Sequence, residues 1–95
     1  MSATVKPFTA ASATKRLANL AKHRLDFIDA SAVFEGPHVI DTARPSGEEQ
    51  RFLAIGNCDG DLVAVVYTMR GERARIISMR RGRTNERLRY QAVHG

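Results

Sequence analysis

Two tight-turn signals divide the C-terminal half of the chain into strand-length segments, and this division limits the possible folds more than any other feature. Asp59-Gly60 separates residues 51–57 from residues 62–69, and Arg70-Gly71-Glu72 separates the latter from residues 73–81. Asp-Gly is a hairpin signal, because its second residue readily adopts positive φ. Residues 62–69 are apolar almost throughout, which predicts a strand buried on both faces. The sequence therefore predicts an antiparallel meander of three strands.

Helical periodicity marks the segment from residue 12 to residue 24, where Ser12 is a suitable N-cap. One stripe of this helix is apolar, and it consists of Ala13, Leu17, Leu20 and Ala21. The opposite face is polar, and it consists of Lys15, Asn19, Lys22 and His23.

A second helix is expected from Asp26, with Asp29 in a capping-box-like position and Gly36-Pro37 as its stop signal. Its core-facing residues are predicted to be Phe27, Ala30 and Phe34. A short strand at Val39-Ile40 and a polar loop over residues 42–50 should follow, and Thr84 can cap a final helix that ends near Val93.

The predicted order is helix, helix, three-strand meander and helix, which is typical of an α+β fold: a small antiparallel sheet with N-terminal helices and a C-terminal helix. The 95 residues are expected to form one domain, residues 1–95, around one small core.

Residues 73–81 are predicted to be a central strand that carries arginines to both of its faces. Simple alternation places Ile76, Ser78 and Arg80 on one face. It places Arg75, Ile77, Met79 and Arg81 on the other.

The positive charge of the chain is concentrated at its C-terminal end. Residues 70–95 hold eight arginines and two glutamates, a balance of 8 − 2 = +6, whereas residues 1–69 hold seven basic and eight acidic residues, a balance of 7 − 8 = −1. Guanidinium groups bind phosphate oxygens in two-point contacts, so nucleic acid is the first partner to consider and an acidic protein the second.

Several classes of protein are disfavoured by the composition. The single cysteine, Cys58, forms no intramolecular disulfide, and we expect it to be a partly buried residue at a strand end. His23, His38 and His94 lie far apart and form no metal-ligand motif, there is no glycine-rich phosphate loop, and no apolar run reaches the ~20 residues that span a bilayer. We therefore expect a cytoplasmic protein without metal, cofactor or membrane contact.

The first 25 residues carry five basic and no acidic residues, as a transit peptide does, but their removal would delete the first helix.

The remaining polar groups suit one reaction on RNA, in which the 2′-hydroxyl attacks the adjacent phosphate. This reaction needs a proton acceptor, a proton donor and cations that stabilise the dianionic transition state. His23 has a suitable ordinary pKa for proton transfer, and Arg75, Arg80 or Arg81 can hold the phosphate. Structural roles are the alternative: Lys22 and His23 as a solvated helix end favoured by the helix dipole, Tyr90 as a helix anchor, and Glu86 as a first-turn dipole partner.

Five segments resemble the signature motifs of the BrnT toxins, in the order and spacing of that family. They are NLAKHRLDF at residues 19–27 with ASAVF at 30–34, EQRFLAIG at 49–56, VVYT at 65–68 with Arg70-Gly71, RIISMRR at 75–81, and Glu86 with Tyr90. The resemblance implies a RelE-like ribonuclease fold and a toxin that cleaves RNA and halts translation. It also implies a BrnA-like antitoxin that binds the toxin and, separately, promoter DNA.

The resemblance and the chemistry together select the candidate site residues. The candidate catalytic residues are Lys22, His23, Arg75, Arg80, Arg81, Glu86 and Tyr90. The candidate RNA-binding residues are Lys15, Arg70, Arg73 and Arg83.

The chain departs from the family pattern at two places. The family carries an acid and a tryptophan where this chain has Ala10 and Ala11, with Ser12 in place of an aspartate and Phe8 displaced by one position. Arg24 stands where the family has glycine, at a helix end that favours positive φ. The first departure favours two alternatives to an active ribonuclease: a catalytically weakened partner in complex assembly and autoregulation, or a basic RNA-binding domain.

Overall fold

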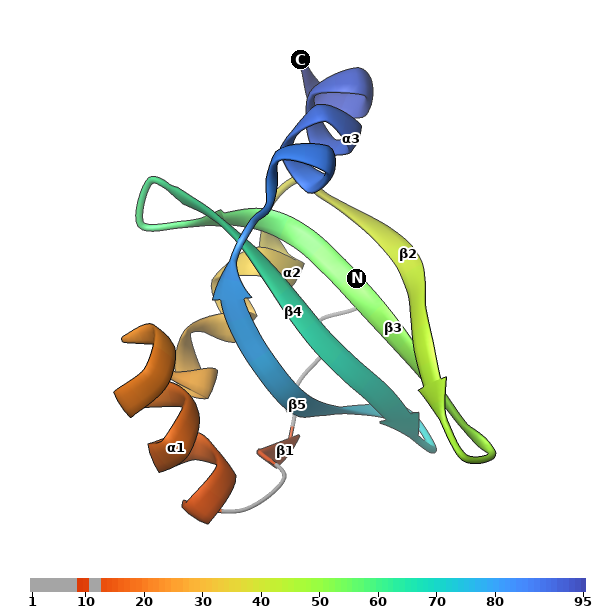
Figure 1. The fold of residues 1–95 in the computed structure, drawn as a ribbon. Coiled ribbons are helices and arrows are strands. Elements are labelled where there is room, and N and C mark those ends of the chain that lie inside the picture. Colours follow the sequence, from red (N-terminus) through yellow and green to blue (C-terminus); the bar gives the residue numbers. More distant parts are fainter. Residues whose placement is uncertain (1–8, 11–12) are drawn as a thin grey trace.

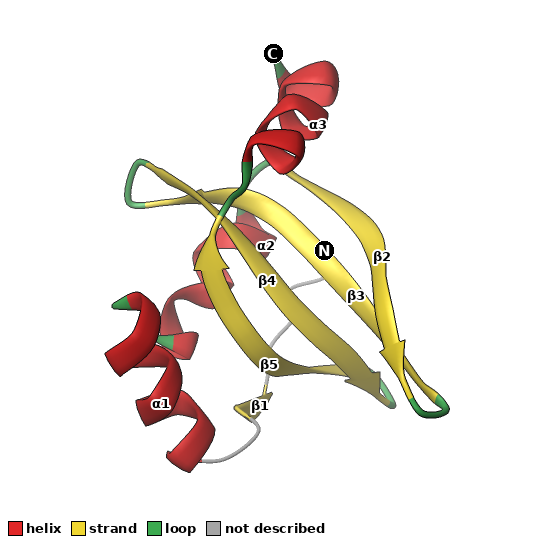
Figure 2. Ribbon diagram, in the orientation of Figure 1, coloured by secondary structure: helices red, strands yellow, loops and turns green. Residues whose placement is uncertain are grey.

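The computed structural model describes residues 9–10 and 13–95, and it shows a five-stranded sheet with helices at its edge, on one face and at one end (Figure 1, Figure 2). In chain order the elements are β1 (Thr9–Ala10), α1 (Ala13–His23), the 3₁₀ turn η1 (Phe27–Asp29), α2 (Ala30–Glu35), β2 (His38–Ser46), β3 (Glu49–Cys58), β4 (Asp61–Arg70), β5 (Arg73–Arg81) and α3 (Thr84–His94). The predicted α+β class is confirmed, and so are helices near residues 12–24 and 84–93. Phe8, Ala11 and Ser12 lie outside the described residues.

The sheet has the strand order β1-β5-β4-β3-β2, with β2 to β5 antiparallel and β1 parallel to β5. The predicted loop over residues 42–50 is wrong, because residues 42–46 extend β2 and Glu49 begins β3. Polar residues and Pro45 are compatible with an edge strand, where one side of the backbone has no ladder partner. The Asp59-Gly60 turn is confirmed, with φ values of 52° and 86° that suit a type I′ hairpin.

The core lies between one face of the sheet and the segment containing η1 and α2. Phe27, Ala30 and Val33 are fully buried there, and Phe34 packs at the margin, as the sequence predicts. The sheet contributes a continuous apolar surface, formed by Ala54, Cys58, Val63, Val65, Tyr67, Ala74, Ile76 and Met79. Cys58 is buried at the end of β3, which confirms its predicted place.

The strand β5 contains a bulge that changes which residues share a face. Tyr67 pairs with Ile76 whereas Val66 pairs with Ser78, so Ile77 is the extra residue. The predicted alternation is therefore wrong: Ile76 and Met79 both lie in the core, on the same face. Arg75, on one side of the bulge, and Ser78 and Arg80, on the other, belong to the opposite face of the sheet. The strand is also less central than predicted, because β1 covers only two residues of its outer edge.

The helix α1 turns its polar face, not its apolar stripe, toward the sheet. Asn19 is buried with 8% of its surface exposed, whereas Leu17 is 62% and Leu20 is 39% exposed. The two faces predicted for this helix exist, but their environments are the reverse of an ordinary amphipathic helix.

The helix α3 follows β5 and lies at one end of the sheet (Figure 1). Its N-cap is Arg83 rather than Thr84, which is the first helical residue. The carboxylate of Glu86 accepts the Arg83 backbone N–H at 2.8 Å, so an acid in the first turn supplies the cap that Thr84 was predicted to supply.

Arg24 adopts a φ of 60° immediately after α1, and its backbone N–H donates to the Leu20 carbonyl at 2.8 Å. Left-handed backbone is unfavourable for a side chain with a Cβ, so replacement of Arg24 with glycine is expected to stabilise the chain by about 0.5–1 kcal/mol. A thermal melt should show a rise in Tm of roughly 2–8 °C. Gly60, which already has positive φ, gives the opposite control: Gly60→Ala should lower Tm. An unchanged Tm for Arg24→Gly would show that Arg24 makes compensating contacts.

Within the described part of the chain, no helix is long and apolar enough to cross a bilayer.

Candidate functional site

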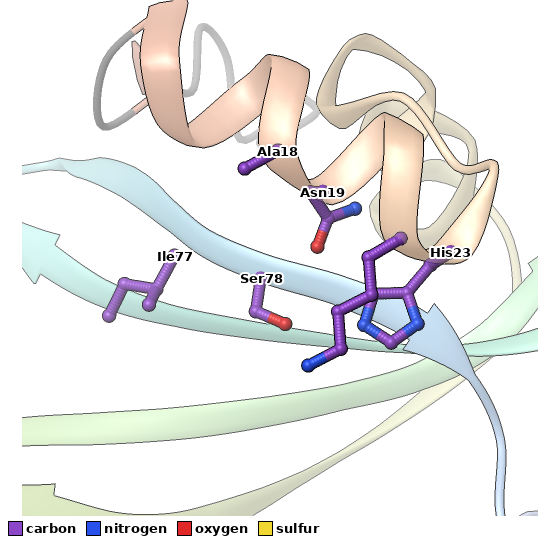
Figure 3. Close-up of a pocket in the computed structure, with 6 residues that line it drawn as sticks. Ala18, Asn19, His23, Ile77 and Ser78 are labelled. Carbon is purple, nitrogen blue, oxygen red and sulfur yellow. The ribbon is translucent and has the colours of Figure 1, made fainter.

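A shallow cleft of about 310 Å³ lies between the last turns of α1 and the outer edge of β5. The helix lines it with Ala18, Asn19, Lys22 and His23, and the strand with Ile77 and Ser78. Figure 3 shows Asn19 projecting from α1 toward the strand that carries Ile77 and Ser78, with His23 at the end of the helix. The cleft therefore joins the two predicted catalytic residues of the helix to the strand with the arginines.

Asn19 fixes the position of α1 against β5. Its amide oxygen accepts the Met79 backbone N–H at 3.1 Å, and its Nδ2 donates to the carbonyls of Met79 and Leu25 at 2.9 and 3.0 Å. The side chain thus occupies the strand edge beyond β1 in the way that a neighbouring strand would. Since Lys22 and His23 follow Asn19 by three and four residues, this contact places them one helical turn along the same side of α1.

The surroundings of His23 favour the neutral form of its imidazole. Burial of the imidazole lowers its pKa below the ordinary value of 6.5, and the charges of Lys22, Arg80 and Arg81 lower it further. A neutral imidazole in a cationic cleft is a proton acceptor, and the surrounding charges attract the phosphate that brings the proton.

Arg80 and Arg81 extend from the end of β5 to different helices. The Arg80 guanidinium makes a two-point ion pair with Glu86 on α3, with both N–O distances 2.8 Å. Arg81 donates from Nη1 to the His23 carbonyl at 3.0 Å and lies 3.9 Å from a carboxylate oxygen of Asp61, while more than half of its side chain stays exposed. Arg81 therefore lies at the C-terminus of α1, beside the cleft.

Glu86 has a structural environment rather than one suited to proton transfer. It is buried, with 5% of its surface exposed, and it joins Arg80 to the N-terminus of α3. The hydrogen bonds from Arg80 are the main reason that its pKa is lowered. A carboxylate held ionised by two partners is a poor proton acceptor at neutral pH.

Tyr90 lies apart from the cleft. Its hydroxyl accepts a hydrogen bond from Asn57 Nδ2 at 3.0 Å, and its ring lies 4.9 Å from that of His94. Asn57 belongs to β3, and β4 separates β3 from β5. The predicted alternative, a half-buried helix anchor, describes this residue.

Arg75 is a half-buried cation near the start of β5, on the face of the sheet opposite the core. Its strand partners are Thr68 on β4 and Thr9 on β1. Among the described residues no carboxylate lies within 4.0 Å of its guanidinium, in contrast to Arg80. Arg75 therefore keeps its charge available for a ligand on this face.

The predicted RNA-binding residues do not form one group. Arg70 and Arg73 face each other at the turn between β4 and β5, where Arg70 lies 3.4 Å from Glu49. Eight residues of strand, or roughly 26 Å, separate Arg73 from Arg81. Arg83 is exposed at the start of α3 beyond β5, and Lys15 belongs to the first turns of α1, where side chains are not described.

Residues 9–10 and 13–95 contain no group of three histidine, cysteine or acidic side chains with the geometry of a metal site. Nδ1 of His38 lies 2.8 Å from the Gly36 carbonyl and Nε2 of His94 lies 2.9 Å from the His38 carbonyl, so both contact backbone away from His23.

Four lining residues were not predicted from the sequence as site residues: Ala18, Asn19, Ile77 and Ser78. Ile77 and Ser78 reach the cleft because of the bulge, which has no clear local signal. The buried position of Asn19 could have been predicted, because an asparagine inside a helix is unfavourable unless its amide has a specific hydrogen-bond partner.

A model of the family described as ribonuclease toxin, BrnT, of type II toxin–antitoxin system matches residues 12–86. The chain belongs to this family. The resemblance found in the sequence motifs is thereby confirmed. BrnT proteins are ribonuclease toxins of type II toxin–antitoxin systems. Membership of the family therefore implies a protein antitoxin and an RNA substrate. The match includes Lys22, His23, Arg75, Arg80, Arg81 and Glu86, and it ends before Tyr90. No curated protein matches the chain.

Proposed function

We propose that this chain is an RNA-cleaving BrnT toxin that acts in the cytoplasm, needs no metal ion and inhibits translation. The single observation that supports this best is the cleft itself, where the His23 imidazole, with its lowered pKa, and the Lys22 ammonium lie beside the end of β5 that carries Arg80 and Arg81. We further propose that a DNA-binding antitoxin neutralises the chain and links it to promoter DNA.

The proposed reaction is an intramolecular transfer at phosphorus. The 2′-oxygen of the nucleotide attacks the adjacent phosphorus as His23 accepts the 2′-hydroxyl proton. The bond to the 5′-oxygen breaks, and this leaving group takes a proton from Lys22. The products are a 2′,3′-cyclic phosphate and a 5′-hydroxyl. Arg81, which lies beside His23, stabilises the charge that develops on the nonbridging oxygens, and Arg75, on the other face of β5 and nearer its start, holds a neighbouring phosphate of the RNA.

Arg80 is assigned a supporting role in this proposal. Both of its terminal nitrogens are engaged by Glu86, so it contributes mainly its electrostatic effect on His23. Glu86 and Tyr90 are assigned to the placement of α3 and not to chemistry. The residues proposed for the reaction itself are therefore Lys22, His23 and Arg81, and Arg75 is proposed to bind the RNA.

We expect the purified chain to cleave RNA equally well with and without EDTA, and to leave 2′,3′-cyclic phosphate ends. The rate should increase as pH rises through the lowered pKa of His23, below 6.5, because only the neutral imidazole accepts the proton. His23→Ala should remove this step in the pH profile. A substrate with 2′-deoxyribose at the cleavage site is the matched control and should resist cleavage.

Loss of activity on chelation, or cleavage of the 2′-deoxy substrate, would contradict the proposed mechanism. Complete absence of RNA cleavage, together with antitoxin binding, would instead favour the weakened partner. One observation favours this second function. Ala10 of β1 pairs with Ile76 of β5, next to Arg75. The family carries an acid at this position, whereas Ala10 supplies no carboxylate there.

A further inference from the structure

The outer face of α1 is exposed and does not contribute to the core. It is formed by Leu17, Leu20, Ala21 and Arg24. Its residues follow the spacing i, i+3, i+4 and i+7, so they form one ridge along the helix. Two leucines that are 62% and 39% exposed on a single helix face are a cluster, in contrast to the scattered apolar residues of ordinary surfaces.

This face results directly from the contact that Asn19 makes. Because Asn19 must point at β5 to bond Met79, the leucines at positions 17 and 20 point away from the sheet. A helix that needed only to cover the sheet would present leucine to it and asparagine to water. The chain has the reverse arrangement, which keeps an apolar ridge on the outside.

A shallow groove of about 380 Å³ lies at the C-terminal end of the ridge, lined by Leu20, Ala21 and Arg24. The surroundings are cationic. Residues 16–26 contain Arg16, Lys22 and Arg24 against Asp26, a balance of 3 − 1 = +2. Arg16 is paired with Asp26 at 2.6 Å, so Lys22 and Arg24 supply the net charge. A partner that fits here must be apolar in its centre and acidic at its margin.

We propose that the outer face of α1 is the docking surface for an acidic amphipathic helix of the antitoxin. This inference rests on the proposed function, because it assumes the antitoxin of a type II module. A helix suits the site since the side-chain ridges of two helices pack together, and an eleven-residue helix offers a straight ridge of about 16 Å.

The area needed for stable binding extends the contact toward the cleft. Stable interfaces bury about 800 Å² on each partner, which is more than one face of an eleven-residue helix provides. Lys22 and His23 lie on the cleft side of the helical turn that also carries Ala21 and Arg24, so a partner of that size reaches around the end of α1 and covers the cleft. Binding at α1 thereby excludes RNA. A second copy of this chain fits poorly, because a symmetric contact would bring two faces with a charge of +2 together.

The test uses the double variant Leu17→Glu with Leu20→Glu and the protein encoded beside this chain's gene. Glutamates at the ridge remove apolar contact and repel an acidic helix, so calorimetry should show at least a 100-fold weaker Kd. Leu88→Glu is the matched control, since Leu88 is 61% exposed on α3, and its Kd should stay within threefold of the parent. Arg24→Glu should slow association and reduce its dependence on ionic strength.

The inference is overturned if the double variant binds within threefold of the parent chain. It is also overturned if the double variant lowers Tm by more than 5 °C in the absence of a partner, since this would show that the chain itself covers the ridge. Dissociation of a self-associated parent chain by the double variant would reassign the face to a second copy. RNA cleavage by each variant is measured in parallel: an inactive parent that binds through the ridge would refute the proposed function and leave the docking surface intact.

Discussion

Replacement of Arg75 with alanine is expected to slow RNA cleavage about 10- to 150-fold, because it removes a charge-assisted contact to an RNA phosphate that is worth about 1.5–3 kcal/mol. The physical reason is that Arg75 is a half-buried cation without an acid partner among the described residues, on the face of β5 that also carries Ser78. Because no ion pair is broken, Tm should fall by less than about 4 °C. Single-turnover cleavage rates and thermal melts measure the two effects separately.

Arg73→Ala provides the matched control, because Arg73 lies on the same strand but is exposed at the turn near Arg70. It should change the cleavage rate by less than threefold at moderate salt. Arg75→Lys keeps the charge but loses the planar fork, so it should recover less than a tenth of the lost activity if the phosphate is held at two points. Full activity of Arg75→Ala would remove this residue from the site and leave Arg81 as the candidate phosphate ligand.

The strands could be predicted from the sequence because their signals are local. Asp59-Gly60 and Arg70-Gly71 each require a tight turn, and the apolar segment between them requires burial on both faces. Residues 42–46 could not be predicted in the same way. Their pairing with β3 is a nonlocal gain that overrides the low strand propensity of a polar segment.

The candidate site could be predicted only in its residue types. Lys22 and His23 stood out as titratable groups on one helix face, and Arg81 as part of a dense basic segment. Their mutual placement depends on two features without a regular pattern, the bulge at Ile77 and the amide of Asn19. The bulge reverses the faces of β5 after Ile76, and Asn19 reverses the expected orientation of α1.

The sequence could not show whether Glu86 and Tyr90 have a structural or a catalytic role. For Glu86 the reason is that an acid in the first turn of a helix can serve equally well as a cap or as a catalyst. The structure distinguishes the two environments by the partners of each group. Glu86 has two partners that hold it charged, and the Tyr90 hydroxyl is bonded to Asn57 away from the cleft.

Removal of one partner from the ion pair between Arg80 and Glu86 should destabilise the chain strongly. Glu86→Gln is expected to destabilise the chain by about 3–5 kcal/mol, because it leaves the largely buried Arg80 charge without a counter-ion. For a chain of this length the loss corresponds to a fall in Tm of roughly 12 °C or more. Glu72→Gln, at an exposed turn, is the control and should leave Tm unchanged within about 2 °C.

The same pair predicts how stability depends on pH. The pKa of Glu86 is lower in the folded chain than in the unfolded chain, so its stabilising effect is complete above the unfolded value of about 4.3 and is lost as pH falls through the folded pKa. Denaturant melts should therefore show a steeper loss of stability below pH 4 in the parent than in Glu86→Gln. An Arg80→Met, Glu86→Leu double variant removes both charges and should be more stable than Glu86→Gln. Equal pH profiles for parent and Glu86→Gln would mean that the pair contributes little, and Arg80 would again be a candidate to bind the phosphate.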